Sequence, residues 1–425
     1  MIESGSEYSE KVRELVREGF TPHFGELTGE FSTNPYWESL AGLGGELWLD
    51  TGDVDEIRRM WTREFKALTT NNTLLNREVQ KGTYDGLIVR ASELLDEYPD
   101  LTEQQRKLEL AFILNARHGL KLVEEFDAYV SVEEHTDLTN DLEGTTNYAR
   151  RLHEVCPERF IVKIPFSPAG LLATRRASRA GIPVNHTLGF SARQNYLIAR
   201  VGRPAFVNVF MGRLNSFVAD NDLGDGGYVG EKATLASQSA VRRLRSGHGL
   251  ATRQIGASFR TGRQVADLAG LDVMTMPPKV AREFLELAVP PAEITDHTGE
   301  DYEPVVDDEV DREAVGLNTL WDIPDRLVEC VDALENESVD DLTADELVDF
   351  FHAHDCGDIL VRWTDEQVET SAREGKIPDL DNWSDLLADG TVGLDSLMNL
   401  AGWNSFNSDQ VAMDERVQKV VSDAD

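Results

Sequence analysis

Eight short apolar segments alternate with amphipathic helical segments between residues 46 and 287, and this alternation constrains the fold more than any other feature. We predict strands at residues 46–51, 67–72, 128–133, 160–165, 182–189, 205–213, 251–260 and 271–276. Alternating strands and helices are typical of a parallel sheet, and eight such units fit a closed α/β barrel of the (β/α)8 TIM type. An open, doubly wound sheet is the structural alternative. The glycine fingerprint of a dinucleotide-binding version of that sheet is missing.

The segments before and after the barrel divide the chain into three predicted parts. These are a helical N-terminal lead-in at 1–44, a catalytic barrel at 45–292, and an acidic linker with a helical C-terminal extension at 293–425. The lead-in is expected to be irregular around Pro22 and Pro35. In the extension we predict helices at residues 323–334, 344–352, 365–374 and 414–422. Apolar residues between Trp383 and Trp403 are expected to pack against another part of the protein.

The net charge of -36 argues against nucleic acid and anionic membranes as partners. No apolar run approaches the ~18 residues of a membrane span, and the N-terminal residues lack the regions of a secretory signal. Cys156, Cys330 and Cys356 are scattered, without metal-ligand spacing, which favours a reducing cytoplasm. The acidic excess and the scarcity of lysine predict a surface adapted to high salt, and an ordinary acidic cytosolic protein is the alternative. Full stability and activity in dilute buffer would contradict that prediction.

Lys163 lies inside the strongly apolar run 160–165, which we interpret as a buried strand. Burial disfavours the ammonium form of lysine, so the free amine becomes available as a nucleophile. A structural lysine that snorkels or forms an ion pair is the alternative. Other predicted strands also carry polar residues near their carboxyl ends, where the active sites of (β/α)8 barrels lie. This arrangement favours a catalytic lysine.

Seven short motifs occur in order on successive predicted strands. They are Leu-Asp-Thr-Gly-Asp at 49–53, Thr-Thr-Asn at 69–71, Val-Ser-Val-Glu at 130–133, Val-Lys-Ile-Pro at 162–165, Asn-His-Thr-Leu at 185–188, Gly-Arg at 212–213 and Gly-Ala-Ser-Phe-Arg at 256–260. Each motif alone is a weak signal, but seven in sequence are a strong one. On these motifs, residues 46–287 resemble the transaldolase family.

The resemblance implies that Lys163 attacks the carbonyl of a ketose phosphate and forms a Schiff base, as in class I aldolases. It implies transfer of a dihydroxyacetone unit from sedoheptulose 7-phosphate or fructose 6-phosphate to an aldose phosphate, in the pentose phosphate pathway. It further implies sugar phosphates as partners and no metal or organic cofactor, and a homodimer is an additional expectation. Two alternatives stay open: an aldolase of fructose 6-phosphate or of a pathway-specific sugar phosphate, and a non-catalytic barrel that binds sugar phosphates.

The resemblance also implies roles for the matched residues. Asp50 would be the general base, and Glu133 and Thr187 would hold the water that relays protons. The expected substrate-binding residues are Asn71, Asn185, Asn208, Phe210, Arg213, Ser258 and Arg260, of which Arg213, Ser258 and Arg260 would bind the phosphate. Phe210 stands where the related fructose-6-phosphate aldolases have tyrosine, which favours transfer over simple cleavage.

Each role has a structural alternative. Asp50 could belong to a turn, Glu133 and Glu134 to a solvated acidic strand end, and Asn71 and Asn72 to a helix cap. Arg213 and Arg260 could form surface ion pairs. His186 points away from the face of its neighbours and is expected to be a packed histidine. Two residues depart from the family pattern: Asn72 stands in place of proline and Asn208 in place of serine. These departures bear on which donor sugar the protein accepts, more than on the Schiff-base chemistry.

Residues 409–416 faintly resemble the C-terminal helix that closes many transaldolases. A lid over the barrel, a dimer contact and an inert appendage are the three interpretations that remain open for this segment.

Overall fold

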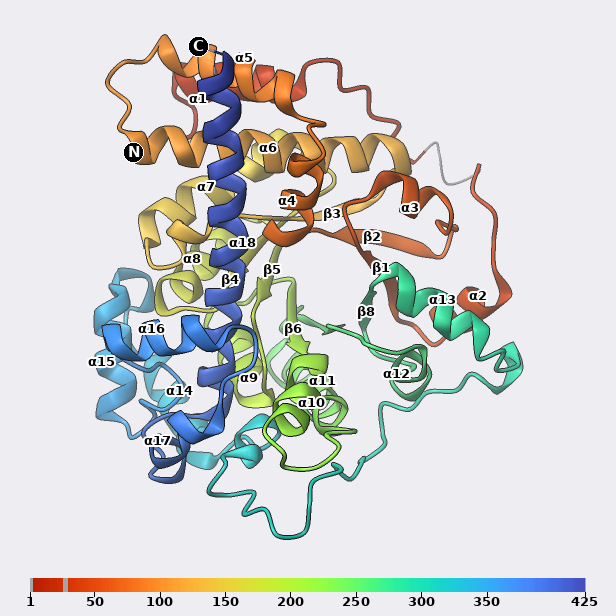
Figure 1. Cartoon of the computed structure of the whole chain (residues 1–425). Coiled ribbons are helices and arrows are strands. Elements are labelled where there is room, and N and C mark those ends of the chain that lie inside the picture. Colours follow the sequence, from red (N-terminus) through yellow and green to blue (C-terminus); the bar gives the residue numbers. More distant parts are fainter. Residues whose placement is uncertain (1–2, 26–29, 425) are drawn as a thin grey trace.

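The eight strands form a closed barrel in which each strand pairs in parallel with the next and β8 pairs with β1 (Figure 1). The structure is a computed structural model that describes residues 3–25 and 30–424. The strands are β1 (Glu46–Asp50), β2 (Phe65–Thr69), β3 (Tyr129–Glu133), β4 (Phe160–Pro165), β5 (Val184–Thr187), β6 (Phe206–Phe210), β7 (Arg253–Ala257) and β8 (Val273–Met276). The predicted (β/α)8 barrel is therefore confirmed.

Helices connect successive strands and surround the barrel. They are α3 (Val54–Arg58), α4 (Asn72–Gln80), α5 (Asp85–Asp96), α6 (Glu103–Phe126), η2 (Thr136–Leu138), α7 (Leu142–Val155), α8 (Pro168–Arg179), α9 (Ala192–Val201), α10 (Met211–Asp220), α11 (Val229–His248), α12 (Gly262–Asp267) and α13 (Pro278–Glu286). Several begin just after a strand with a side chain that accepts a backbone N–H, such as Asn71, Ser167 and Ser191. These caps fix the strand-to-helix turns at the carboxyl end of the barrel.

The inward-facing side chains alternate along each strand, as the pleat requires. Below the carboxyl end of the barrel they include the large apolar residues Trp48, Ile161 and Ile255, which are almost completely buried. Trp48 packs edge-on against Phe206, with ring centroids 4.9 Å apart. The barrel is consequently filled below its carboxyl end, and an open site is confined to that end.

β6 and β7 end before the predicted residues, and this difference determines where Arg213 and Ser258 lie. β6 ends at Phe210 rather than Arg213, because α10 begins at Met211 without an intervening loop. A Cβ atom at Gly212 would lie 2.2 Å from the backbone oxygen of Ser258, so only glycine allows this approach. β7 ends at Ala257 rather than Arg260, and Ser258 adopts a left-handed φ of 61°. Arg213 therefore lies on the first turn of a helix.

The lead-in consists of α1 (Glu7–Arg17) and α2 (Pro35–Gly42). The irregular structure predicted around Pro35 is wrong, because Pro35 occupies the first turn of α2 behind the capping side chain of Asn34. Proline suits that position, since its missing N–H would have no helical partner there. Around Pro22 the chain is irregular, as predicted.

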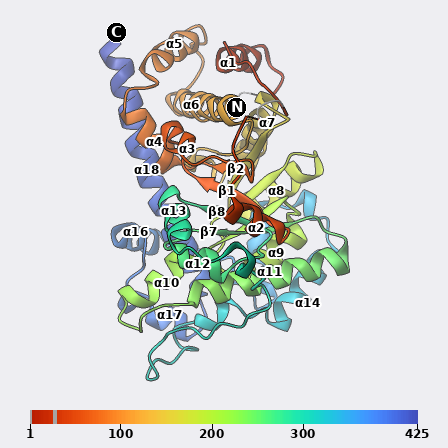
Figure 2. The same ribbon diagram turned by 90° about the vertical axis from the view of Figure 1, so that its right-hand side faces the viewer.

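The extension is helical, as predicted, and it packs on the barrel. Its elements are η3 (Pro291–Glu293), η4 (Leu317–Leu320), α14 (Asp325–Leu334), η5 (Val339–Asp341), α15 (Ala344–Ala353), α16 (Asp365–Glu374), η6 (Leu380–Asn382), α17 (Ser384–Ala388) and α18 (Leu394–Ala424). The helix predicted at 414–422 is the last part of α18, a 31-residue helix that runs along one side of the barrel (Figures 1 and 2). No boundary between independent domains follows from this packing, so the three-part division stays a prediction.

A buried ion pair holds the start of α18 against the barrel. Arg193 on α9 donates to both carboxylate oxygens of Asp395, at 2.8 and 2.6 Å, and also pairs with Asp358 at 2.5 Å. Ser191 donates to Asp395 at 2.6 Å. Buried charges of this kind persist when they are paired and hydrogen-bonded, so this cluster fixes where the extension meets the barrel.

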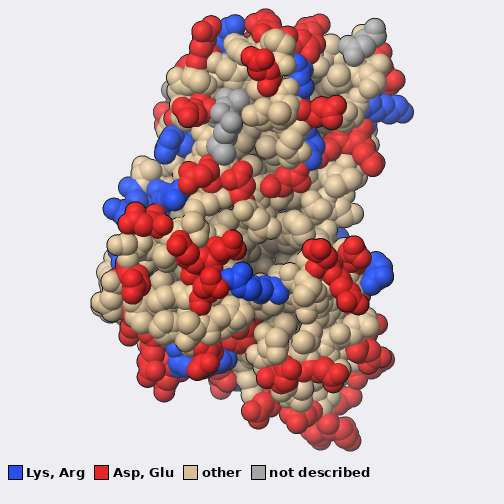
Figure 3. All heavy atoms as spheres, turned by 90° about the vertical axis from the view of Figure 1, so that its left-hand side faces the viewer, with Lys and Arg blue, Asp and Glu red and all other residues tan. Residues whose placement is uncertain are grey.

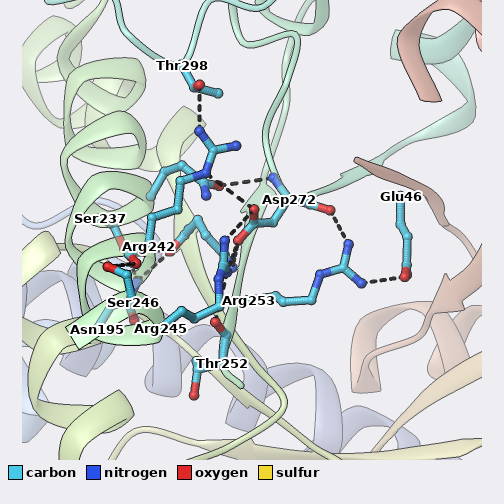
Figure 4. Close-up of polar contacts among 12 residues, drawn as sticks. Glu46, Asn195, Ser237, Arg242, Arg245, Ser246, Thr252, Arg253, Asp272 and Thr298 are labelled. Carbon is cyan, nitrogen blue, oxygen red and sulfur yellow. Dashed lines mark hydrogen bonds and ion pairs between the residues drawn. The ribbon is translucent and has the colours of Figure 1, made fainter. Parts of the chain in front are cut away.

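A second polar network closes the barrel at its amino-terminal end (Figure 4). Arg253 on β7 donates to the backbone oxygen of Asp272, just before β8, at 2.6 Å and forms an ion pair with Glu46 on β1. The carboxylate of Asp272 accepts a hydrogen bond from Arg245 at 3.0 Å. The backbone N–H of Asp272 donates to the side-chain oxygen of Gln238. Burial opposes ionisation of Asp272, but the hydrogen bond and charge of Arg245, together with the backbone N–H of Gln254, outweigh it and hold the pKa below its ordinary value.

The surface carries many carboxylates, as expected from the net charge of -36. On the face shown in Figure 3, Asp and Glu are spread over the whole molecule and Lys and Arg occupy smaller areas. Within residues 3–25 and 30–424, every helix is too short or too polar to span a lipid bilayer.

We predict that Asp272→Asn lowers the free energy of unfolding by about 3 kcal/mol at neutral pH, because it removes one partner of a mostly buried ion pair. The depressed pKa means that this stabilisation exists above the unfolded pKa of an aspartate and is lost as pH falls through the folded pKa. Denaturant unfolding across acidic pH should therefore show the two proteins converging. Asp301→Asn, in an exposed ion pair with Lys232, is the control and should change little. Equal effects of the two substitutions would contradict this role of Asp272.

Candidate active site

A pocket of about 400 Å³ opens at the carboxyl end of the barrel. Ten of the eleven predicted site residues line it: Asp50, Asn71, Lys163, Asn185, Thr187, Asn208, Phe210, Arg213, Ser258 and Arg260. The eleventh, Glu133, lies next to the amine of Lys163. Strand alternation explains part of the convergence, since six of them occupy alternating strand positions that face the barrel interior: Asp50, Lys163, Asn185, Thr187, Asn208 and Phe210. The other four lie in the segments that directly follow β2, β6 and β7. The structure thus brings the predicted residues together, while their chemical roles stay predictions.

Lys163 is buried, with 4% of its surface exposed. Its Nζ donates to the backbone oxygen of Thr70 at 3.1 Å and lies 3.4 Å from Oε2 of Glu133. The snorkelling alternative is therefore wrong, because the amine stays inside the barrel. The amine does form an ion pair, with Glu133. It also faces the pocket, where a carbonyl substrate can reach it.

Asp50 faces Lys163 from β1. Its Oδ1 accepts from Thr69 at 2.8 Å, and Thr69 also contacts the hydroxyl of Thr275 at 2.7 Å. Burial raises the pKa of Asp50, while the charge of Lys163 and the bond from Thr69 oppose that rise. A carboxylate with a raised pKa and a fixed orientation suits a general base.

Glu133 and Glu134 are both buried, so the solvated acidic strand end is wrong. Burial raises the pKa of Glu133, against the opposing charge of Lys163 and a hydrogen bond from the backbone N–H of Asn72. Burial and the neighbouring Glu133 raise the pKa of Glu134 well above its ordinary value. Glu133 is consequently a group that can hold a proton close to the amine.

The amide side chains form a chain of hydrogen bonds across three strands. Asn208 donates to Asn185 at 3.1 Å, and Asn185 donates to Ser131 at 3.1 Å. The Oγ1 of Thr187 is buried at the pocket and finds no hydrogen-bond partner among the described residues. A hydroxyl in that position can hold a water or a substrate oxygen.

Two structural alternatives are confirmed. Asn71 caps α4, its side chain accepting from the N–H of Leu74 at 2.9 Å, although it also lines the pocket. His186 is a fully buried, packed histidine whose Nδ1 contacts the hydroxyl of Thr174 at 2.7 Å. Burial lowers the pKa of His186 to about 3, so the ring is neutral.

Arg213 and Arg260 form a cationic end of the pocket. Arg213 is 6% exposed, and burial together with the charge of Arg260 lowers its pKa to about 10. The Nη1 of Arg213 has no hydrogen-bond partner within the part of the chain that the structure describes. The surface ion pairs considered for both arginines do not occur among the described residues. Two guanidinium groups that form no ion pair within the described residues, together with the hydroxyl of Ser258, suit a phosphate.

The pocket residues that sequence reasoning missed include three cations and one aromatic ring: Arg77 on α4, Lys279 on α13, Lys376 between α16 and η6, and Phe406 on α18. With them, six Lys or Arg and two Asp or Glu line the pocket of a strongly acidic protein. No motif marks these residues, because helices and the extension deliver them. Among residues 3–25 and 30–424, no group of three or more His, Cys, Asp or Glu side chains could hold a metal ion.

A buried lysine between two carboxylates, at the carboxyl end of a (β/α)8 barrel, defines a candidate Schiff-base enzyme. Comparison with known families identifies it further. The family model "Transaldolase/Fructose-6-phosphate aldolase" matches residues 47–322, and the chain belongs to this family.

Individual relatives agree with the family. The protein is 30% identical over 242 residues to a transaldolase of Xanthomonas euvesicatoria pv. vesicatoria, covering 55% of this chain and 73% of the relative. It is 27% identical over 259 residues to transaldolase A of Pasteurella multocida, covering 59% and 80%. With a transaldolase of Aliivibrio salmonicida it is 25% identical over 312 residues, covering 70% and 94%.

We predict that inorganic phosphate binds at Arg213 and Arg260. Arg260→Gln should weaken the binding about tenfold, because it removes a charge-assisted hydrogen-bond donor. Isothermal titration with phosphate measures the effect. Arg90→Gln, at an exposed ion pair with Glu18 outside the pocket, is the control and should bind like the wild type. Unchanged affinity in Arg260→Gln would refute this assignment.

Proposed function

We propose that the protein is a transaldolase that moves a dihydroxyacetone unit from a ketose phosphate to an aldose phosphate through a Schiff base on Lys163. The observation that carries the proposal is the placement of the Lys163 amine, buried beside Glu133 and open to a pocket with a cationic end. Membership of the family supports the same chemistry. Sedoheptulose 7-phosphate and fructose 6-phosphate are the proposed donors.

In the first step, the amine of Lys163 adds to the C2 carbonyl of the donor and the carbonyl oxygen gains a proton. Loss of that oxygen as water requires a second proton and leaves an iminium. Glu133, whose pKa is raised by burial, is placed to supply protons next to the amine. We assign Thr187 the task of holding the relaying water, since its hydroxyl is otherwise unpaired in the described structure.

In the second step, Asp50 takes the proton of the C4 hydroxyl and the bond between C3 and C4 breaks. The C4 carbon leaves as the aldehyde of the shortened aldose phosphate, and the bonding electrons move into an enamine on Lys163. The enamine then adds to the acceptor aldehyde, and the same steps run in reverse to release the new ketose phosphate and the free amine of Lys163. Asn71, Asn185 and Asn208 are assigned to the donor's hydroxyl groups.

The alternative of an aldolase that releases dihydroxyacetone requires protonation of the enamine. Phe210 lines the pocket and has no hydroxyl that could assist such a step. The phenylalanine therefore favours transfer. The alternative of a non-catalytic binding barrel predicts that Lys163 is dispensable, which the first experiment below decides.

The protein's setting is also a proposal. We place it in the cytoplasm and in carbohydrate metabolism, and we propose a homodimer and a surface adapted to high salt. The net charge of -36 supports the last point, since a strongly acidic surface stays hydrated and soluble in concentrated salt.

Borohydride should trap a three-carbon adduct on Lys163 when the protein is incubated with fructose 6-phosphate. Adding erythrose 4-phosphate should remove the adduct, because the acceptor discharges the enamine. Lys163→Met should lose both adduct and turnover while keeping phosphate affinity, and peptide mass spectrometry locates the adduct. Lys66→Met, on an exposed position of β2, is the control and should react normally. A turnover-competent Lys163→Met protein would exclude the proposed mechanism.

The transfer rate should fall on the acid side as Asp50 becomes protonated, since a general base must be ionised. Because burial raises the pKa of Asp50, this fall should begin at a higher pH than for an exposed aspartate. Asp50→Asn should cut kcat/KM by about 10²-fold or more and remove that limb of the pH profile. A mutant that retains the acid limb would show that another group controls it.

A further inference from the structure

The extension contributes to the pocket, although it lies mostly outside the region that the family model matches, residues 47–322. Lys376 and Phe406 both line the cavity. Of the three interpretations of the tail, an inert appendage is thus wrong.

Phe406 is 7% exposed and lies between the reactive amine and the cationic end of the pocket. The Nζ of Lys163 is 5.6 Å from its ring centroid, and the guanidinium carbon of Arg213 is 5.4 Å from it. Its ring also meets the ring of Phe210 edge-on, with centroids 6.3 Å apart. Two phenylalanines, one from β6 and one from α18, thus form a continuous apolar wall beside Lys163.

Several contacts of α18 fix this ring in place. Asn399 donates to the backbone oxygens of Phe166 at 3.3 Å and Leu188 at 3.1 Å, at the ends of β4 and β5. At Gly402, one turn before Phe406, a Cβ atom would lie 3.0 Å from Leu188 and 3.4 Å from Arg213. The helix therefore approaches the pocket closely at a residue without a side chain.

The neighbouring turns are tied to the barrel as well. Asn407 accepts from Thr136 at 2.8 Å, and Asp409 accepts a hydrogen bond from Thr73. The negative charge of Asp409 also favours the charged form of Arg213, and so acts to raise its pKa. The face of α18 that carries residues 402, 406 and 409 is accordingly the face turned to the site, as expected of residues three and four apart on a helix.

The enamine on Lys163 has two fates, and water separates them. An acceptor aldehyde gives transfer. A proton from solvent on the nucleophilic carbon instead returns an iminium, and addition of one water to that iminium releases dihydroxyacetone and the free amine. Apolar side chains that keep water from the reacting carbon suppress the second fate.

We propose that Phe406 is a specificity-determining residue, which favours transfer over release of dihydroxyacetone by closing the wall beside the Lys163 enamine to water. This inference rests on the proposed function. The site then includes a residue of the C-terminal extension, and α18 helps to decide whether the enamine reacts with an acceptor aldehyde or takes a proton from solvent.

The test compares two rates for each variant: release of dihydroxyacetone from fructose 6-phosphate alone, and transfer to erythrose 4-phosphate. Phe406→Ala should raise the ratio of release to transfer by about fivefold or more, because it opens the wall to water. Val411→Ala, at an exposed residue of the same helix, is the matched control and should keep the wild-type ratio. A folded Phe406→Ala protein whose ratio stays within about twofold of wild type would overturn the proposal.

Phe406→Leu removes the ring but keeps much of its apolar volume, so it covers the case in which the alanine variant fails to fold. Its ratio should rise by about twofold or more, and an unchanged ratio would overturn the proposal as well. Failure of the proposed function looks different. In that case the wild type itself gives neither a borohydride adduct nor transfer, whereas failure of this inference leaves wild-type transfer intact.

Discussion

Closure of the barrel is the constraint on which the site depends. Because β8 pairs with β1 in parallel, the carboxyl ends of all eight strands surround one opening. Residues far apart in sequence, such as Asp50, Lys163 and Ser258, then share one pocket without any local contact between their segments. The network around Asp272 at the opposite end joins β7, β8 and β1 by side-chain bonds, at the seam where the last strand meets the first.

The reactive groups are coupled through burial. Taking Asp50 and Glu133 out of water raises the pKa of both, and the charge of Lys163 opposes the rise in each case. The lysine is therefore the shared counter-charge of two carboxylates. An iminium keeps a positive charge at that position. In the proposed mechanism the neutral enamine forms as Asp50 takes up a proton, so the positive charge and one of the negative charges disappear together. A site arranged in this way exchanges protons without leaving an uncompensated buried charge.

Strand residues of the site could be predicted from the sequence, and helical ones largely could not. Period-2 alternation is local, so a polar residue at the end of an apolar run, such as Lys163, can be placed on the inner face from the sequence alone. The end of β6 was missed because the apolar pattern continues into Met211, where α10 already begins. Phe406 lies on a helix with buried residues on several sides, and its direction depends on how α18 docks. Long-range packing decides that direction, and no short pattern encodes it.

The acidic chain and its anionic substrates would repel one another without the local charge of the pocket. Six Lys or Arg side chains line the cavity, and Arg213 pays a desolvation cost that lowers its pKa to about 10. Its neighbour Arg260 adds like-charge repulsion, and the unpaired Nη1 of Arg213 leaves a donor unused in the described structure. A bound phosphate would offset the desolvation cost and the repulsion between the two arginines by pairing with both guanidinium groups. It would also accept a hydrogen bond from the free donor of Arg213. The attraction is therefore short-ranged and confined to the pocket, since the surrounding carboxylates cancel it at a distance and salt screens what remains.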